Sequence, residues 1–183
     1  MRKRKTIKFS ALIVVLTVLA VSGCGCFTVG VRALHWNGMI VSQEGSPFNP
    51  EGISSFSKLS YKPSPGTPPI SIRMPDGRLI QPDQLNRNAL NAYIRKGLAR
   101  RGKYVITVMY SRGATSVRLD ENGQMKTLVI DIHPVHSYKN INSKRPAIGV
   151  PGNNKLLEFP LREKDLKDLF GKPSKDETFL HGT

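Results

Sequence analysis

The first 31 residues constrain this chain most, because they decide which part of it is left to fold. Five basic residues and no acid stand in residues 1–8, and no residue from Phe9 to Val31 is charged. A basic start followed by an apolar run is typical of a secretory signal peptide, with the basic end held on the cytoplasmic side. We therefore expect the rest of the chain to be exported and the folded part to follow this segment.

The apolar run contains the short motif Val21-Ser22-Gly23-Cys24. It resembles the lipobox of bacterial lipoproteins, in which a branched apolar residue and two small residues precede a cysteine. The resemblance implies that the Cys24 thiol receives a diacylglycerol, that the chain is cut before Cys24, and that residues 1–23 are the removed signal peptide. Two or three acyl chains attach a protein stably to a membrane. Gly25 stands where an Asp favours inner-membrane retention, so the resemblance favours the periplasmic face of the outer membrane.

Two other interpretations of this segment stay open. The uncharged run is long enough to span a bilayer as an uncleaved helix, which takes about 20 residues. It also fits an ordinary signal peptide that is cut at another place. All three interpretations put the domain outside the cytoplasm.

Cleavage before Cys24 would leave 160 of the 183 residues, enough for one domain with a core. Cys26 is the only other cysteine, so an acylated Cys24 leaves no pair for an internal disulfide. The signal peptide holds five of the 28 Lys and Arg and none of the 13 Asp and Glu, so the mature chain has a net charge of 23 minus 13, or +10. Outside the cytoplasm this charge meets lipid headgroups, lipopolysaccharide and wall polymers rather than nucleic acid.

Residues 24–69 are predicted to form a lipidated N-terminus and a tether. Residues 42–69 are rich in Ser, Pro and Gly, a composition that favours loops and extended segments. An apolar patch within residues 27–41 allows one short strand or a contact with the domain edge. An ordered loop that lies on the domain is the alternative.

Residues 70–173 are predicted to form a basic α+β domain, and residues 174–183 a frayed tail. Alternating apolar residues on both sides of a Pro-Asp-Gly turn predict a hairpin over 70–80. We expect the domain to contain an antiparallel sheet of about four to six strands.

The main helix is predicted over about 84–101. Apolar residues at spacings of three and four give it one buried face. Asp83 can cap its start, and Gly102 stands where a left-handed C-terminal cap is wanted.

Three strands after this helix are predicted to form an antiparallel meander over 104–110, 115–119 and 124–132. An Asn-Gly pair at 122–123 marks the second turn. A short C-terminal helix is predicted over about 162–170, where a Gly and a Pro follow the apolar residues.

Basic residues gather at the predicted end of the main helix and the start of the next strand. The candidates for binding an anionic ligand are Arg95, Lys96, Arg100, Arg101 and Lys103. On one surface they could bind phosphate groups of lipid or glycan, since Arg forms paired hydrogen bonds with phosphate. A solvated helix face is the alternative. A second basic group lies at Lys139, Lys144 and Arg145.

Asp131, His133 and His136 form a close group of metal-ligand residue types. A strand would turn Asp131 and His133 to the same side, and three such ligands could hold zinc. The spacing is loose and no fourth ligand is evident. We therefore expect a strand that runs into a polar loop, with no metal or other cofactor.

The sequence contains no nucleophile elbow, phosphate loop or His-Glu-x-x-His motif. It predicts a lipid-anchored, non-enzymatic protein of the bacterial cell envelope that binds an anionic envelope component or an envelope protein. A scaffold or assembly subunit of an envelope complex and an envelope hydrolase are the alternatives.

Overall fold

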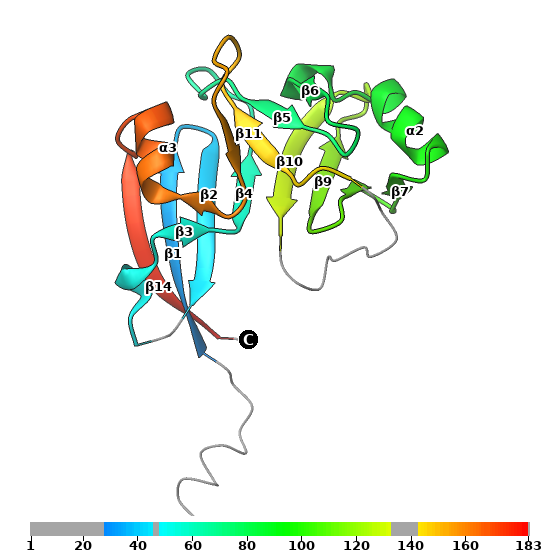
Figure 1. The fold of residues 1–183 in the computed structure, drawn as a ribbon. Coiled ribbons are helices and arrows are strands. Elements are labelled where there is room, and N and C mark those ends of the chain that lie inside the picture. The colour runs from blue at the N-terminus through cyan, green and yellow to red at the C-terminus, as the bar shows by residue number, and fades with distance from the viewer. Residues whose placement is uncertain (1–27, 46–47, 133–142, 183) are drawn as a thin grey trace, which may run out of the picture.

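The computed structural model describes residues 28–45, 48–132 and 143–182, and Figure 1 shows their arrangement. The fold is α+β and dominated by strands. In chain order the elements are β1 Thr28–Trp36, β2 Met39–Gly45, η1 Pro50–Gly52, β3 Ser55–Phe56, β4 Lys58–Tyr61, β5 Ser71–Arg73, β6 Leu79–Ile80, η2 Pro82–Gln84, α2 Arg87–Arg95, β7 Ala99–Arg101, β8 Ile106–Met109, β9 Ala114–Leu119, β10 Met125–Asp131, β11 Ala147–Gly149, β12 Leu156–Glu158, β13 Leu161–Arg162, α3 Glu163–Phe170 and β14 Lys175–Gly182.

The strands form three antiparallel sheets. The largest has eight strands in the order β14-β1-β2-β4-β10-β9-β8-β7, so β14 and β7 are its edges. A four-stranded sheet has the order β12-β11-β5-β6, and β13 pairs with β3. The large sheet has more strands than the four to six expected, because strands from both ends of the described chain join it.

One face of the large sheet forms the core. A single row across seven neighbouring strands, paired residue to residue, is buried throughout and runs Leu34, Val41, Leu59, Ile130, Thr115, Val108, Ala99. Residues of a strand alternate between the two faces, so this row defines the face that excludes water. The only polar member is Thr115, and its hydroxyl donates a hydrogen bond to the buried hydroxyl of Tyr110 at 3.3 Å.

A second layer covers this core face. In Figure 1, α3 lies in front of β1 and β2, β5 and β11 lie in front of the other half of the large sheet, and α2 lies beside β7 at the right. Trp36 joins the layers, because its ring meets Phe170 edge to face at 6.1 Å and its Nε1 donates to the carbonyl of Gly171 at 3.2 Å. The opposite face of the large sheet has no such layer among the described residues.

The tether predicted for residues 24–69 is wrong wherever the structure describes that segment as strand. Residues 28–45 form the β1–β2 hairpin, and residues 55–61 add β3 and β4. The hairpin turns at Asn37-Gly38, where Gly38 takes a φ of +69° that favours glycine. Residues 62–69 match the alternative of an ordered loop, since Lys62 N donates to the carbonyl of Gly38 at 2.7 Å and Asn37 Nδ2 to that of Pro65 at 2.7 Å.

The main helix is shorter than the predicted 84–101. It begins after Asn86, whose Oδ1 accepts a hydrogen bond from Ala89 N at 3.0 Å, and Asp83 lies in the preceding 3-10 turn. It ends at Arg95 with Lys96 as its C-cap, because Gly97 takes a φ of +70° and turns the chain back. Residues 99–101, predicted as helix, form the edge strand β7.

Several predicted elements are confirmed. The hairpin over 70–80 is β5 and β6, the meander is β8, β9 and β10, and the short helix is α3. The frayed tail predicted for 174–183 is wrong, since β14 pairs with β1 over its whole length. This pairing depends on residues about 150 positions earlier in the chain, and local sequence cannot indicate it.

Candidate functional site: a basic hairpin

The basic candidates lie around one hairpin at the edge of the large sheet. β7 and β8 are joined by residues 102–105, and Gly102 N donates to the carbonyl of Val105 at 2.8 Å. We call residues 99–109 the basic hairpin. Arg100 pairs with Thr107 and shares its face, the one turned away from the core. Arg101 lies on the other side, where its Nη2 donates to Asn91 Oδ1 of α2 at 2.5 Å.

The tip of the hairpin combines a positive charge with exposed apolar surface. Lys103 is exposed, and its Nζ lies 5.0 Å from the ring centroid of Tyr104. Tyr104 is 64 % exposed and Val105 is 37 % exposed. A tyrosine ring beside a lysine is amphipathic, and such side chains favour interfaces between water and an apolar or charged surface.

The end of α2 contributes Arg95 and Lys96, with different surroundings. Lys96 Nζ lies 3.6 Å from Asp76 Oδ2 and 5.6 Å from the Tyr93 ring centroid, so it takes part in the packing of α2. Burial acts to raise the pKa of Asp76, but hydrogen bonds from Tyr93 and Arg78 outweigh it and hold the pKa below its usual value. Asp76 is therefore a carboxylate that neutralises Lys96. Arg95 is exposed and pairs with no acid among the described residues.

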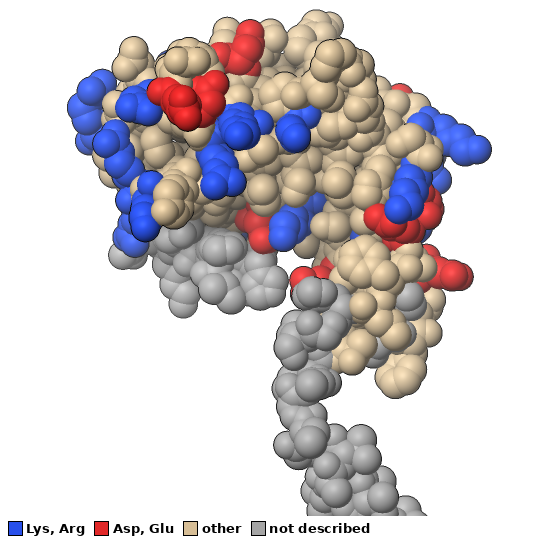
Figure 2. Space-filling model, turned by 180° about the vertical axis from the view of Figure 1, so that it is seen from behind, with Lys and Arg blue, Asp and Glu red and all other residues tan. Residues whose placement is uncertain are grey.

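The segment around the hairpin has an unusual charge distribution. From Gln84 to Leu119 the chain has eight Lys and Arg and no Asp or Glu. In Figure 2 basic side chains gather along the edge that carries α2 and β7, on the left in that view. Of the five candidates, Arg95, Arg100 and Lys103 have no acid partner in the described part of the chain. Lys96 pairs with Asp76, and Arg101 donates a hydrogen bond to Asn91.

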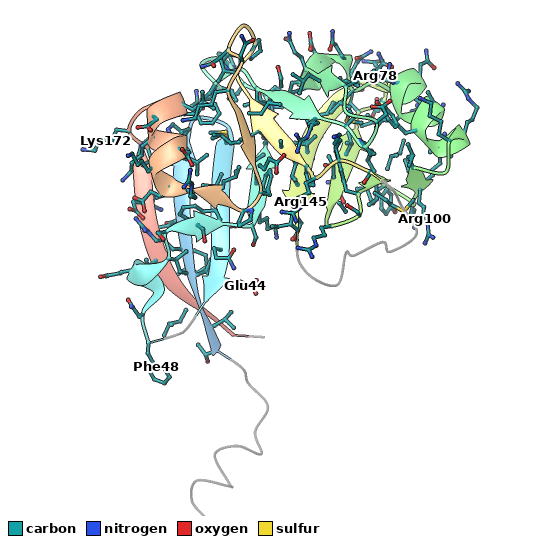
Figure 3. The ribbon with its side chains drawn as sticks, viewed as in Figure 1. Glu44, Phe48, Arg78, Arg100, Arg145 and Lys172 are labelled. Atoms are coloured by element: carbon teal, nitrogen blue, oxygen red, sulfur yellow. The ribbon has the colours of Figure 1, made fainter. Side chains whose placement is uncertain are left out.

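The second basic group does not join the hairpin in the described residues. Lys139 lies outside them. Lys144 lies near Gly77 in the β5–β6 turn, and the carbonyl of Arg145 accepts a hydrogen bond from Arg73 Nε at 2.9 Å. Figure 3 shows Arg145 and Arg100 at separate places on the molecule.

Sequence reasoning missed Tyr104 as part of the site. The alternation of apolar residues placed it inside a strand over 104–110, but β8 begins at Ile106 and Tyr104 lies in the turn. Gly102 could have indicated this turn, since a glycine between two periodic segments is typical of a turn.

The candidate metal ligands are only partly described. Asp131 ends β10 opposite Lys58, and it lines a surface cavity of about 410 Å³ with His35 and Glu177 on the uncovered face of the sheet. His35 Nε2 lies 2.6 Å from Glu177 Oε1. His133 and His136 lie outside the described residues, so the zinc prediction remains a prediction. The residues that the structure describes contain no group of three metal ligands.

Cys24 also lies outside the described residues, and its lipidation remains a prediction. None of the described helices is long and apolar enough to cross a bilayer. The chain has no match among protein-family models, curated proteins or solved structures.

Proposed function

We propose that this chain is a lipid-anchored, non-enzymatic protein of the bacterial cell envelope that binds a phosphate-bearing anionic component through the basic hairpin. The supporting observation is the acid-free basic edge, where Arg95, Arg100 and Lys103 have no described acid partner and Tyr104 is exposed beside Lys103. Arginine forms paired hydrogen bonds with phosphate oxygens, and each Lys or Arg near an anionic bilayer contributes about 1 kcal/mol. The proposal extends to lipid headgroups, lipopolysaccharide and wall polymers, and the test below separates these sources.

Reversing two charges on the hairpin, Arg100→Glu with Lys103→Glu, is expected to weaken binding by at least about 2 kcal/mol, or about 30-fold. The matched control is Lys164→Glu with Lys172→Glu, two exposed residues on α3 and just after it. It changes the net charge equally. Co-sedimentation of the chain from Thr28 onward, with phosphatidylglycerol vesicles, lipopolysaccharide or wall fragments at increasing salt, measures the effect. Equal losses in both variants would show that net charge, not the hairpin, drives binding.

The anchor is tested by the intact mass and membrane partitioning of the full chain expressed in a bacterium, beside Cys24→Ala. We expect a mass that corresponds to cleavage before Cys24 plus acyl chains, and loss of this mass in the variant. A full-length unmodified mass would indicate a membrane helix over residues 9–31 instead. A cleaved and unmodified product would indicate a free secreted protein.

A scaffold or assembly role is the second candidate, and one observation favours it. β14 is an edge strand of the large sheet, and its residues Phe179 and Leu180 are 45 % and 61 % exposed. An edge strand with exposed apolar side chains can pair with an extended segment of a partner protein. Crosslinking in cells that returned only the monomer would contradict this role.

A further inference from the structure

Exposed apolar side chains lie at the end of the large sheet where β1 begins. Phe48 is 94 % exposed, and Leu180 lies on β14 at the same end. Gly30 pairs with Leu180 on one side and with Gly45 on the other, so these three positions share one level of the sheet, two residues from the start of β1. Phe48 lies in the turn after β2, and Figure 3 shows its side chain at this end of the molecule, pointing away from the sheet.

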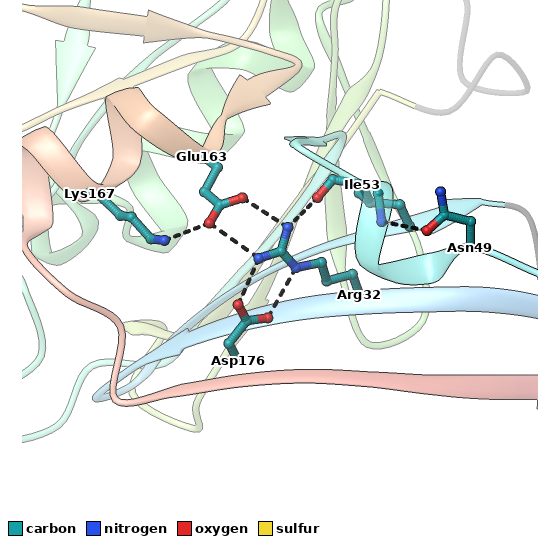
Figure 4. A network of polar contacts seen from close by, with 7 residues as sticks. Arg32, Asn49, Ile53, Glu163, Lys167 and Asp176 are labelled. Carbon is teal, nitrogen blue, oxygen red and sulfur yellow. Dashed lines mark hydrogen bonds and ion pairs between the residues drawn. The ribbon is translucent and has the colours of Figure 1, made fainter.

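The residues that follow Phe48 are bound to one another and to β1. Asn49 Oδ1 accepts a hydrogen bond from Gly52 N at 3.0 Å, and Arg32 Nη1 of β1 donates to the carbonyl of Ile53 at 2.5 Å. The same guanidinium binds Glu163 of α3 and Asp176 of β14, as Figure 4 shows. Phe48 therefore directly precedes a hydrogen-bonded segment at the end of the sheet.

The position of Cys24 before β1 indicates that a membrane faces this end of the large sheet. Cys24 precedes Thr28 by four residues, which span at most about 14 Å when extended. We propose that Phe48 and Leu180 form a seat on the bilayer, in which Phe48 enters the boundary between headgroups and acyl chains. Phenylalanine and leucine are common in segments buried at this depth. The proposal rests on the lipid anchor of the proposed function.

The seat and the basic hairpin are separate surfaces. Figure 3 shows Phe48 near the start of β1 and Arg100 in the other half of the molecule. Binding of an anionic component at the hairpin and contact with the anchoring bilayer at Phe48 can therefore be measured independently.

The test uses Phe48→Trp in the full chain, processed in a bacterium and reconstituted into phosphatidylcholine vesicles with or without brominated acyl chains. The matched control is Leu79→Trp, because Leu79 is 50 % exposed on β6 in the second layer. Trp36, the only natural tryptophan, is buried in both variants and gives a constant background. We expect the emission of Phe48→Trp to shift to the blue on vesicles and to be quenched by the brominated lipid, and that of Leu79→Trp to change little.

The outcomes distinguish the seat from the anchor. If the acylated protein sediments with vesicles but Phe48→Trp is quenched no more than Leu79→Trp, the seat is overturned and the anchor stands. If the intact mass corresponds to a cleaved chain without acyl groups, the anchor fails and the seat fails with it.

Discussion

Replacing Leu34 by alanine is expected to destabilise the folded protein by about 2–5 kcal/mol. Leu34 is fully buried in β1, where it pairs with Val41 of β2 in the row that crosses the large sheet. The substitution removes buried apolar surface and leaves a cavity that a sheet held on both sides closes poorly. The measurement is the midpoint of urea unfolding. The dependence of the unfolding free energy on urea concentration should be the same in the variant and the wild type.

The control for this prediction comes from the same hairpin. Ile40 lies on β2 with its side chain on the uncovered face and is 38 % exposed. Ile40→Ala is expected to cost less than about 1 kcal/mol, since surface substitutions rarely cost more. A loss for Leu34→Ala as small as the loss for Ile40→Ala would mean that residues 28–45 do not form part of the core. The predicted tether would then describe this segment better than the sheet does.

The first two strands were missed although the sequence contains a marker for them. Asn37-Gly38 separates an apolar run that ends at Trp36 from one that begins at Met39. An Asn-Gly pair in this setting is the same hairpin signal that correctly predicted the turn at 122–123. The Ser, Pro and Gly content of residues 42–69 concealed it, because composition averages over a segment that holds both short strands and ordered loops.

The predicted end of the main helix was wrong for a different reason. The apolar periodicity of residues 90–98 continues into Ala99, and helix-favouring residues continue through Arg101. Gly97 ends the helix, because it adopts a left-handed conformation and lets Leu98 N donate to the carbonyl of Tyr93 at 2.9 Å. An isolated glycine inside a periodic segment costs only about 1 kcal/mol, so sequence alone does not decide whether it weakens or ends a helix. The sequence singled out the basic residues as candidates, but placing Arg100, Arg101 and Lys103 on a hairpin depends on where the helix ends.

The contacts that depend on distant parts of the chain could not be predicted at all. Arg32 and Asp176 are 144 residues apart, yet the Asp176 carboxylate accepts hydrogen bonds from Arg32 Nε at 3.0 Å and Nη2 at 2.7 Å. Neither residue stands in a motif, and each would pass for an ordinary surface charge. Their pairing follows from the addition of β14 to the edge of the sheet beside β1.

Replacing Arg32 by methionine is expected to destabilise the protein by about 1–3 kcal/mol. The guanidinium binds two carboxylates and one backbone carbonyl, and its side chain is only 12 % exposed. Methionine keeps much of the apolar stem but leaves Glu163 and Asp176 close together without their cation. The loss stays below that of a fully buried pair, because the Asp176 side chain is 42 % exposed and water screens its charge. Lys167→Met is the control: it removes a cation 2.6 Å from Glu163 that is itself 43 % exposed, and should cost at most about 1 kcal/mol.

The pH dependence of this difference tests its electrostatic origin. Hydrogen bonds from Arg32 lower the pKa of Asp176. Burial acts to raise the pKa of Glu163, but hydrogen bonds from Lys167 and Arg32 outweigh it and hold this pKa below its usual value. A carboxyl group whose folded pKa is lowered stabilises the protein above its unfolded pKa, and this contribution is lost as the pH falls through the folded value. The gap between wild type and Arg32→Met should therefore be full near pH 6 and narrow as the pH falls from about 4.5 towards about 3. Urea unfolding of both proteins across this range measures the gap, and a gap that stays constant with pH would assign the role of Arg32 to packing rather than to charge.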